Sequence, residues 1–227
     1  MRRKSLVQRH YFGLPEETRR ELCLEILGDA GVIGDWSVEV RRYVEGELIP
    51  LAETGWICVL VEGFVRVRVG YCGYTGMRQA TISLAGPWQL VWCGMDDLPG
   101  AEALTGCGVI RLPTASAGAS AALLDLLEDL LAAYEGTAWV MLPRETRARL
   151  SRLLMLLAGR FGREFRGGGI LVPLEPRRTD LAEMVAATRE SVTQAMADLL
   201  RQRVLKVHSN GIIIEDATAL AALADNP

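Results

Sequence analysis

The segment from Arg177 to Asp216 constrains the fold of this chain most, because the spacing of its apolar residues changes from a helical to a strand-like period. A helix predicted to open at Thr188 has one apolar face that a neighbouring element must bury. That face consists of Val192, Ala195, Met196, Leu199 and Leu200. A shorter helix from about Thr179 to Ala186 precedes it, with Thr179 as its N-cap. The two helices together predict a helix-turn-helix.

The residues after Arg203 form two short β-prone runs, which flank Ser209, Asn210 and Gly211. Because Asn-Gly is a strong signal for a tight turn, we expect the two runs to pair as a hairpin. Two helices followed by a hairpin are typical of a winged helix-turn-helix, which places its second helix in the major groove of DNA.

The polar face of the second helix predicts contacts to DNA. Thr188 is the expected N-cap, and the free N–H groups of that helix terminus favour a phosphate. Residues 144–211 hold 13 Lys or Arg against 7 Asp or Glu, although the whole chain has a net charge of −3, so positive charge collects on this module. The side chains expected to contact bases or phosphates are Arg178, Thr188, Arg189, Glu190, Ser191, Thr193, Gln194, Arg203 and Lys206.

The segment DLAEMVAATRESVTQAMADLLRQRVL resembles the DNA-binding signature of a family of bacterial regulators. That family includes the cyclic AMP receptor protein and the fumarate and nitrate reduction regulator. In the family an Arg-Glu pair opens the recognition helix and contacts a G and a C, and the resemblance carries these roles to Arg189 and Glu190. The polar residue after the pair corresponds to Ser191. A later position, often Arg in the family, is Gln194 here, so the resemblance does not define the base read there.

The stretch from Trp36 to Pro113 alternates short β-like runs with Gly, Pro and Asp. The period of two expected of a strand with one solvated face is shown by Val61, Val65, Val67 and Val69. These runs predict an antiparallel barrel. The resemblance implies a cyclic-nucleotide-type β-roll, with a short helix from about Pro15 to Leu27 packed at its entry. The expected fold class is α+β, with a β-roll domain (1–115), a dimerisation helix (116–142) and a winged helix-turn-helix domain (143–227).

The segment 86–104 lacks the phosphate cassette with which members of that family hold a cyclic nucleotide. No Arg lies between Arg78 and Arg111, and nearby acidic residues would repel a phosphate. We therefore expect no binding of cyclic AMP. The apolar residues found there instead either fill the roll or line a pocket for an apolar or planar effector. The residues of that possible pocket are Trp88, Trp92 and Met95.

The residues from Ser116 to Met141 predict a helix that is apolar over much of its circumference. Such a helix needs partners on two sides, and we expect these to be the barrel and a second copy of the helix. A helix buried within one subunit is the alternative, but the resemblance implies a homodimer. The expected dimerisation residues are Leu123, Leu124, Leu127, Leu130, Leu131 and Tyr134. Pro143 is expected to stop the helix before the next one, Arg144–Phe165, which Gly167–Gly169 closes.

Metal and cofactor sites are not expected, because His10 and His208 are the only histidines and the five cysteines form no Cys-x-x-Cys pair. Scattered cysteines favour reduced thiols. The chain has no apolar run that could span a bilayer, and residues 1–12 lack the apolar stretch of a signal peptide. These features predict a cytoplasmic protein without contact to a membrane.

The sequence contains no catalytic motif, such as a Gly-rich phosphate loop or a nucleophile elbow, so we expect no enzyme. The interpretation is a homodimeric transcription regulator, an activator, with double-stranded DNA, a second copy of itself and RNA polymerase as partners. The alternative is a ligand-sensing or interaction β-roll module that binds nucleic acid only nonspecifically. The ratio of specific to nonspecific affinity distinguishes the two.

Overall fold

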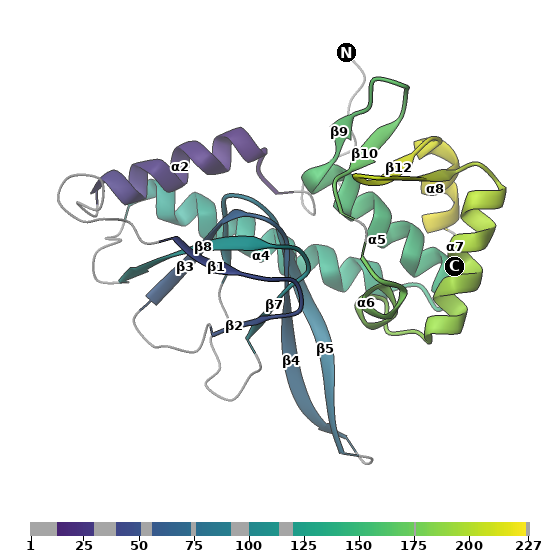
Figure 1. The fold of residues 1–227 in the computed structure, drawn as a ribbon, viewed down its shortest axis with the longest axis horizontal. Coiled ribbons are helices and arrows are strands. Elements are labelled where there is room, and N and C mark those ends of the chain that lie inside the picture. Colours follow the sequence, from purple (N-terminus) through teal and green to yellow (C-terminus); the bar gives the residue numbers. More distant parts are fainter. Residues whose placement is uncertain are drawn as a thin grey trace. The chain divides into compact units, whose positions relative to one another are not determined.

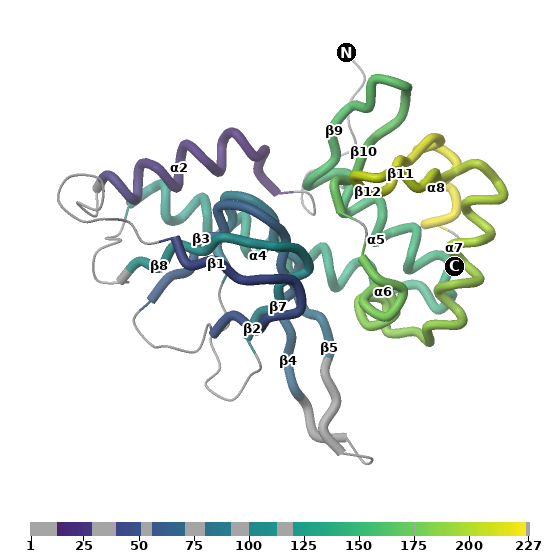
Figure 2. The backbone as a smooth tube through the Cα atoms, in the orientation of Figure 1, coloured from purple at the N-terminus to yellow at the C-terminus, as the bar shows by residue number. Residues whose placement is uncertain are grey.

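The computed structural model describes residues 13–29, 40–50, 56–73, 76–91, 100–113, 120–174 and 176–225 (Figures 1 and 2). The chain divides into two compact units, one of which is Gly13–Tyr134 and the other of which contains Glu135–Pro227. Each unit has its own sheets and core.

The first unit contains two four-stranded antiparallel sheets, in the orders β1-β8-β3-β6 and β2-β7-β4-β5. Buried residues of both sheets, among them Leu60, Val67 and Val109, form one core cluster. This is the β-roll predicted from the valine alternation. Its elements are α2 (Glu16–Asp29), β1 (Val40–Tyr43), β2 (Leu48–Ile49), β3 (Trp56–Glu62), β4 (Val65–Gly73), β5 (Gly76–Ala85), β6 (Gln89–Val91), β7 (Ala101–Ala103) and β8 (Cys107–Pro113).

A second core cluster joins the first sheet to α2 and to the helix α4 (Ala121–Met141). Cys23, Ile26 and Leu27 of α2 pack in it with Val59 and Ile110 of the sheet. From α4, the cluster takes Ala122, Leu126 and Leu130. The β3–β8–β6 part of the sheet is therefore apolar on both faces, which explains why the β3 run Cys58-Val59-Leu60 is buried without alternation.

The second unit combines helices with a small sheet of order β11-β12-β10-β9. The helix α5 lies at its centre, and five of its leucines are buried. The elements after α4 are α5 (Thr146–Phe161), β9 (Arg163–Glu164), β10 (Ile170–Val172), α6 (Arg178–Met184), α7 (Arg189–Arg201), β11 (Leu205–His208), β12 (Gly211–Ile214) and α8 (Ala217–Ala224). The observed mixture of helices and antiparallel sheets confirms the predicted α+β class.

The first helix of this unit is shorter than expected. It was predicted over Arg144–Phe165 but ends at Phe161, because Gly162 adopts an extended conformation and Arg163-Glu164 pair with β10. The glycines 167–169 therefore do not close the helix and lie instead in the turn of the β9–β10 hairpin. Gly168 and Gly169 have φ of 92° and 87°, a region that favours glycine.

The helix α6 begins one residue before the predicted start, and Thr179 is not its N-cap. Arg177 occupies the cap position, and the Asp180 carboxylate accepts a hydrogen bond from the backbone N–H of Arg177 at 3.1 Å. This contact opens the helix before Thr179, whose side chain is exposed. The helix α4 ends at Met141, two residues before Pro143. None of the described helices combines the length and apolar character needed to cross a bilayer.

Candidate DNA-binding surface

The helices α6 and α7 form a helix-turn-helix with a close connection. Ala186 in the turn has φ of 46°, and the N–H of Ala187 donates to the carbonyl of Ala182 at 2.9 Å. Four of the five apolar residues predicted to be buried on α7 are buried, and Leu200 is half-buried. Leu181, Met184 and Val185 are buried at α6 and the turn. One face of α7 is thereby fixed in the core, and the opposite face is exposed.

The start of α7 is held by its own hydroxyl groups. Thr188 is the N-cap, as predicted, and its Oγ1 accepts a hydrogen bond from the N–H of Ser191 at 3.1 Å. The Ser191 hydroxyl lies 3.0 Å from that of Thr188. Thr193 donates its hydroxyl proton to the carbonyl of Arg189 at 2.7 Å. These three predicted contact residues therefore use their hydroxyls to order the helix terminus.

Arg189 and Glu190 occupy the first turn of α7 with exposed side chains. Neither side chain makes a hydrogen bond or an ion pair with any part of the chain that the structure describes. Glu190 is also favoured at this place by the positive end of the helix dipole. The pair thus offers a planar donor group and a carboxylate acceptor to whatever lies against the helix.

Gln194 lies one turn further along the same face of α7. Its Nε2 donates to Asp198 Oδ1 at 3.1 Å. Asp198 also forms an ion pair with Arg201. Gln194 and Asp198 line a surface hollow of about 450 Å³ together with Ser191, Ala195 and residues 145–147 at the start of α5.

The basic residues predicted to meet phosphates lie around this helix. Arg178 is the half-buried first residue of α6, Arg203 is exposed just after α7 with φ of 57°, and Lys206 is exposed on β11. No ion pair neutralises these three side chains within the described ranges of the chain. Their positive charge is therefore available to an anionic partner.

The wing is the β11–β12 hairpin, with Ser209 and Asn210 in its turn and His208 paired with Gly211. The sequence predicted this hairpin but not the role of its glycine. A Cβ on Gly211 would lie 2.0 Å from the carbonyl oxygen of Val172, so glycine is required by the close approach of β10. His208 also contacts the ring of Phe165 edge-on, with centroids 5.1 Å apart, which ties the wing to the β9–β10 hairpin.

Arg149 of α5 binds backbone carbonyls of the turn between α6 and α7. Sequence reasoning did not single out this residue. Arg149 donates through Nη1 to the carbonyls of Val185 and Ala186 at 3.1 and 3.2 Å. Its Nε and Nη2 donate to the carbonyls of Pro143 and Arg144 at 2.7 and 3.3 Å. The turn before α7 and the connection after α4 are thus held by one guanidinium. An arginine inside a helix carries no sequence signal for such a role.

A second arginine of α5 joins two helix ends. Arg152 donates to the carbonyl of Trp139 in α4 and to the carbonyl of Ala224 in α8, each at 2.9 Å. Its guanidinium also lies 4.9 Å from the centre of the Trp139 ring. The positive charge suits both helix C-termini.

The helix-turn-helix segment is similar to that of known transcriptional regulators. Residues 148–223 match the family model described as a Crp-like helix-turn-helix domain. A CRP-like cAMP-activated global transcriptional regulator of Mycobacterium tuberculosis is 32% identical over 76 residues, which are 34% of this chain and 34% of that protein. The chain thus spans about a third of the length of the curated relatives it matches.

Solved structures extend the similarity to both units. A CRP-family transcriptional regulator from Thermus thermophilus has a TM-score of 0.63 and 26% identity, covering 82% of this chain and 97% of that one. Residues 148–223 thus belong to the Crp-like helix-turn-helix family, and the chain as a whole is similar to CRP-family transcriptional regulators. A CooA mutant from Carboxydothermus hydrogenoformans shares the fold, with a TM-score of 0.65, 18% identity and coverage of 89% and 95%.

The apolar residues of α4 point in two directions. Leu123, Leu130 and Tyr134 pack on the core that joins α4 to the roll, and Leu130 is only 7% exposed. The other three residues predicted for dimerisation are exposed, at 63%, 44% and 57% for Leu124, Leu127 and Leu131. The predicted set therefore mixes a face covered by the protein's own roll with a face that is open.

In the β-roll, Arg66 and Arg68 lie two residues apart on β4, and both pair with the carboxylate of Glu102 in β7. Arg66 Nη2 donates to the two Glu102 oxygens at 3.0 and 3.1 Å, and Arg68 forms a further ion pair with Glu102. Arg66 is buried, so the polar positions of the β4 alternation are not simply solvated as the sequence suggested.

Of the predicted effector pocket, Trp92 and Met95 lie outside the described residues. Trp88 is half-buried and packs on the cluster of α2, α4 and the first sheet, with the Arg20 guanidinium 5.6 Å from its ring centre. It does not belong to the core between the two sheets. In the described part of the chain, no group of three His, Cys, Asp or Glu could hold a metal ion.

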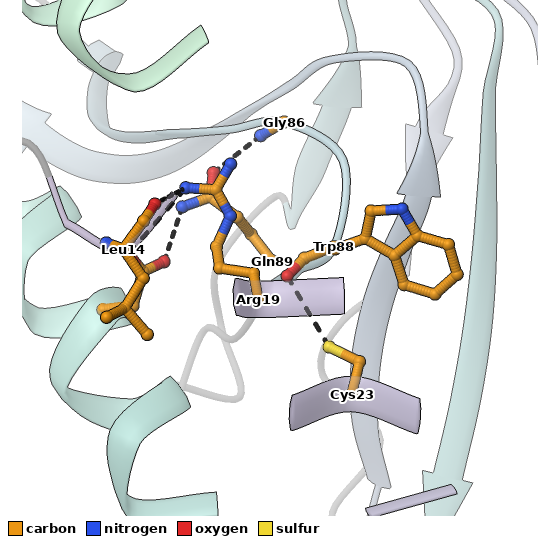
Figure 3. A network of polar contacts seen from close by, with 7 residues as sticks. Leu14, Arg19, Cys23, Gly86, Trp88 and Gln89 are labelled. Atoms are coloured by element: carbon orange, nitrogen blue, oxygen red, sulfur yellow. Dashed lines mark hydrogen bonds and ion pairs between the residues drawn. The ribbon is translucent and has the colours of Figure 1, made fainter. Parts of the chain in front are cut away.

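A buried polar network lies beside the backbone of Trp88, whose indole ring points away from it (Figure 3). Asp129 of α4 accepts from the N–H of Leu14 at 2.6 Å and from Gln89 Nε2 at 2.7 Å. Arg19 lies 4.0 Å from the same carboxylate and donates to the carbonyl of Leu14. Burial lowers the pKa of Arg19, and the negative charge of Asp129 partly offsets this decrease. The network links α2, α4 and the turn before β6.

Proposed function

We propose that this protein is a sequence-specific DNA-binding transcription regulator that reads its site with α7. The observation that carries the proposal is the state of Arg189 and Glu190, which are exposed and unpaired on a capped helix whose other face is buried. A guanidinium can donate two hydrogen bonds to O6 and N7 of a G, and a carboxylate can accept from N4 of a C. Arg203 and Lys206 would supply contacts to phosphates.

We further propose that the protein acts as a homodimer through the open face of α4. Leu124, Leu127 and Leu131 follow a spacing of three and four residues, so they form one stripe. A stripe of exposed leucines on a helix is costly in water and is covered when two copies pair. A two-fold dimer would bind an inverted repeat with half-sites about 10 base pairs apart.

Regulation without cyclic AMP is the third part of the proposal. The Mycobacterium tuberculosis relative is described as cAMP-activated, but this chain has no Arg between Arg78 and Arg111 for the nucleotide phosphate. Arg66 and Arg68 are engaged by Glu102. We therefore expect the DNA-binding state to be populated without that ligand. We also propose that the protein is an activator that contacts RNA polymerase, acts in the cytoplasm and is not an enzyme.

Selection of bound DNA from a random pool by the purified protein tests the proposal. We expect an inverted repeat whose half-sites each contain a G and a C, bound about 10³-fold or more tightly than random DNA. Adding cyclic AMP should leave this affinity unchanged. Equal binding of all sequences would favour the alternative, a β-roll module with only nonspecific nucleic-acid binding. Strong tightening by cyclic AMP would overturn the ligand-independent part alone.

A further inference from the structure

We propose that Asp198 is a positioning residue that orients the Gln194 amide, so that Gln194 reads an adenine in each half-site. The inference rests on the proposed function, because it assigns a base to the recognition helix. It starts from the contact in which Gln194 Nε2 donates to Asp198 Oδ1 at 3.1 Å. Gln194 is exposed, and Asp198 lies one turn behind it, half-buried.

The contact removes an ambiguity of the glutamine side chain. A free Gln can turn its amide by half a rotation and present either its oxygen or its nitrogen at a given place. An ionised carboxylate accepts hydrogen bonds and cannot donate one. A turned amide would therefore set its oxygen against the oxygen of Asp198, and the orientation with the nitrogen toward Asp198 is preferred.

The fixed amide has one pattern of donors and acceptors left. One N–H is used by Asp198, while the second N–H and the oxygen remain side by side. An adenine offers the matching pair in the major groove, because N7 accepts and N6 donates. A guanine offers two acceptors, N7 and O6, and the latter would oppose the amide oxygen. The orientation set by Asp198 thus favours adenine over guanine.

The charge of Asp198 is compensated within the helix. A carboxylate on a recognition helix would repel DNA phosphates, but Arg201 forms an ion pair with the same oxygen that accepts from Gln194. Arg201 is exposed, and its positive charge offsets the negative charge that Asp198 would present to the DNA phosphates. Asp198 can therefore hold Gln194 without a net repulsion.

The position of the adenine follows from the helix geometry. Gln194 is four residues beyond Glu190, which corresponds to about 6 Å along the axis of α7. Successive base pairs are about 3.4 Å apart. The adenine should thus lie within about two base pairs of the C contacted by Glu190.

The test compares selected DNA for the wild type, Asp198→Ala, Asp198→Asn and Arg201→Ala, with folding of each checked by its melting temperature. We expect the wild type to prefer adenine at least about fivefold within that window. Asp198→Ala should lose most of this preference. Asp198→Asn should lose part of the preference, because its amide can also donate and so no longer excludes the turned Gln194 amide. Arg201→Ala, the matched control, should weaken binding to all sequences and leave the preference.

Two results would overturn the inference and leave the proposed function intact. One is a half-site that retains its G and C but shows no adenine preference in the window. The other is an adenine preference that Asp198→Ala does not change, since Asp198 would then only stabilise the helix. A protein that prefers no sequence at all would overturn the proposed function as well, so the two failures can be told apart.

Discussion

Burial raises the pKa of the Cys23 thiol from 9.0 to about 12, although Arg19 nearby lowers it in part. The thiol is a donor to the carbonyl of Trp88 at 3.6 Å and lies in the cluster that joins α2 to the roll. Sequence reasoning expected reduced thiols, and Cys23, Cys58 and Cys107 are buried and form no disulfide. The sequence could not tell which of them is also next to a buried ion pair.

Alkaline pH should therefore destabilise the protein through Cys23. The unfolded chain releases this proton near pH 9, whereas the folded chain keeps it until about pH 12, so the stabilisation is present below pH 9 and is lost as the pH rises to about 12. From about pH 8 to about pH 10 the free energy of unfolding should fall by about 1.4 kcal/mol more in the wild type than in Cys23→Ala. Urea unfolding at both pH values measures this. An equal loss in the two proteins would contradict the assignment.

At the scale of elements, α5 is the support on which the recognition helix depends. Its leucines fill the core of the second unit, while Arg149 and Arg152 bind carbonyls of the segments around it. These contacts decide where α7 lies, but they involve backbone atoms that are far apart in sequence. An arginine that binds such carbonyls looks, in sequence, like one that binds a phosphate.

Replacing Arg149 by Ala should leave carbonyls of the turn and of the α4–α5 connection without a donor. We expect the free energy of unfolding to fall by about 2–3 kcal/mol, as for other hydrogen bonds to charged groups. Arg149→Lys should restore only part of this free energy, because one ammonium group cannot make all the hydrogen bonds of the planar guanidinium. Arg147→Ala, in the first turn of the same helix, is the control. Chemical denaturation checks the series, and equal effects at 147 and 149 would refute the special role of Arg149.

The elements predicted well from sequence are those whose period is set by one buried face. The helix α7 and its cap at Thr188 are such cases. The strand β4 was also expected, but Arg66 on its expected solvated face is buried, so its burial does not alternate. The β9–β10 hairpin was missed because β9 has only two residues and so no period. The predicted dimerisation residues of α4 included buried and exposed ones, because leucines at three- and four-residue steps form stripes on both sides of the helix. The sequence does not reveal which stripe packs on the roll. Asp129 was missed because its partners, Leu14 and Gln89, are distant in sequence.

At the scale of the whole molecule, the open leucines of α4 lead to a prediction about assembly. Glu at both Leu127 and Leu131 would place charges in the proposed dimer interface, at a cost of several kcal/mol. Leu130 is not suitable for this test, because it is buried against the β-roll of the same subunit. The double variant should sediment as a monomer at micromolar concentration and still be folded, with a melting temperature lowered only by the loss of the dimer contact. Glu128→Gln, exposed on the same helix, is the control and should remain a dimer.

A monomeric wild type would contradict the proposed dimer. The dimer matters for function because two copies of α7 are needed for an inverted repeat. Loss of dimerisation should thus lower the affinity for the full site far more than the affinity for random DNA.

The central claim is that α7 reads bases, and the most direct measurement compares Arg189→Ala with Lys206→Ala on the selected site and on random DNA. We predict that Arg189→Ala costs about 1–3 kcal/mol per half-site on the selected site and little on random DNA. Lys206→Ala should weaken both DNAs alike and reduce the salt dependence by about one phosphate contact. If both variants lower the two affinities by the same factor, base readout by α7 is contradicted.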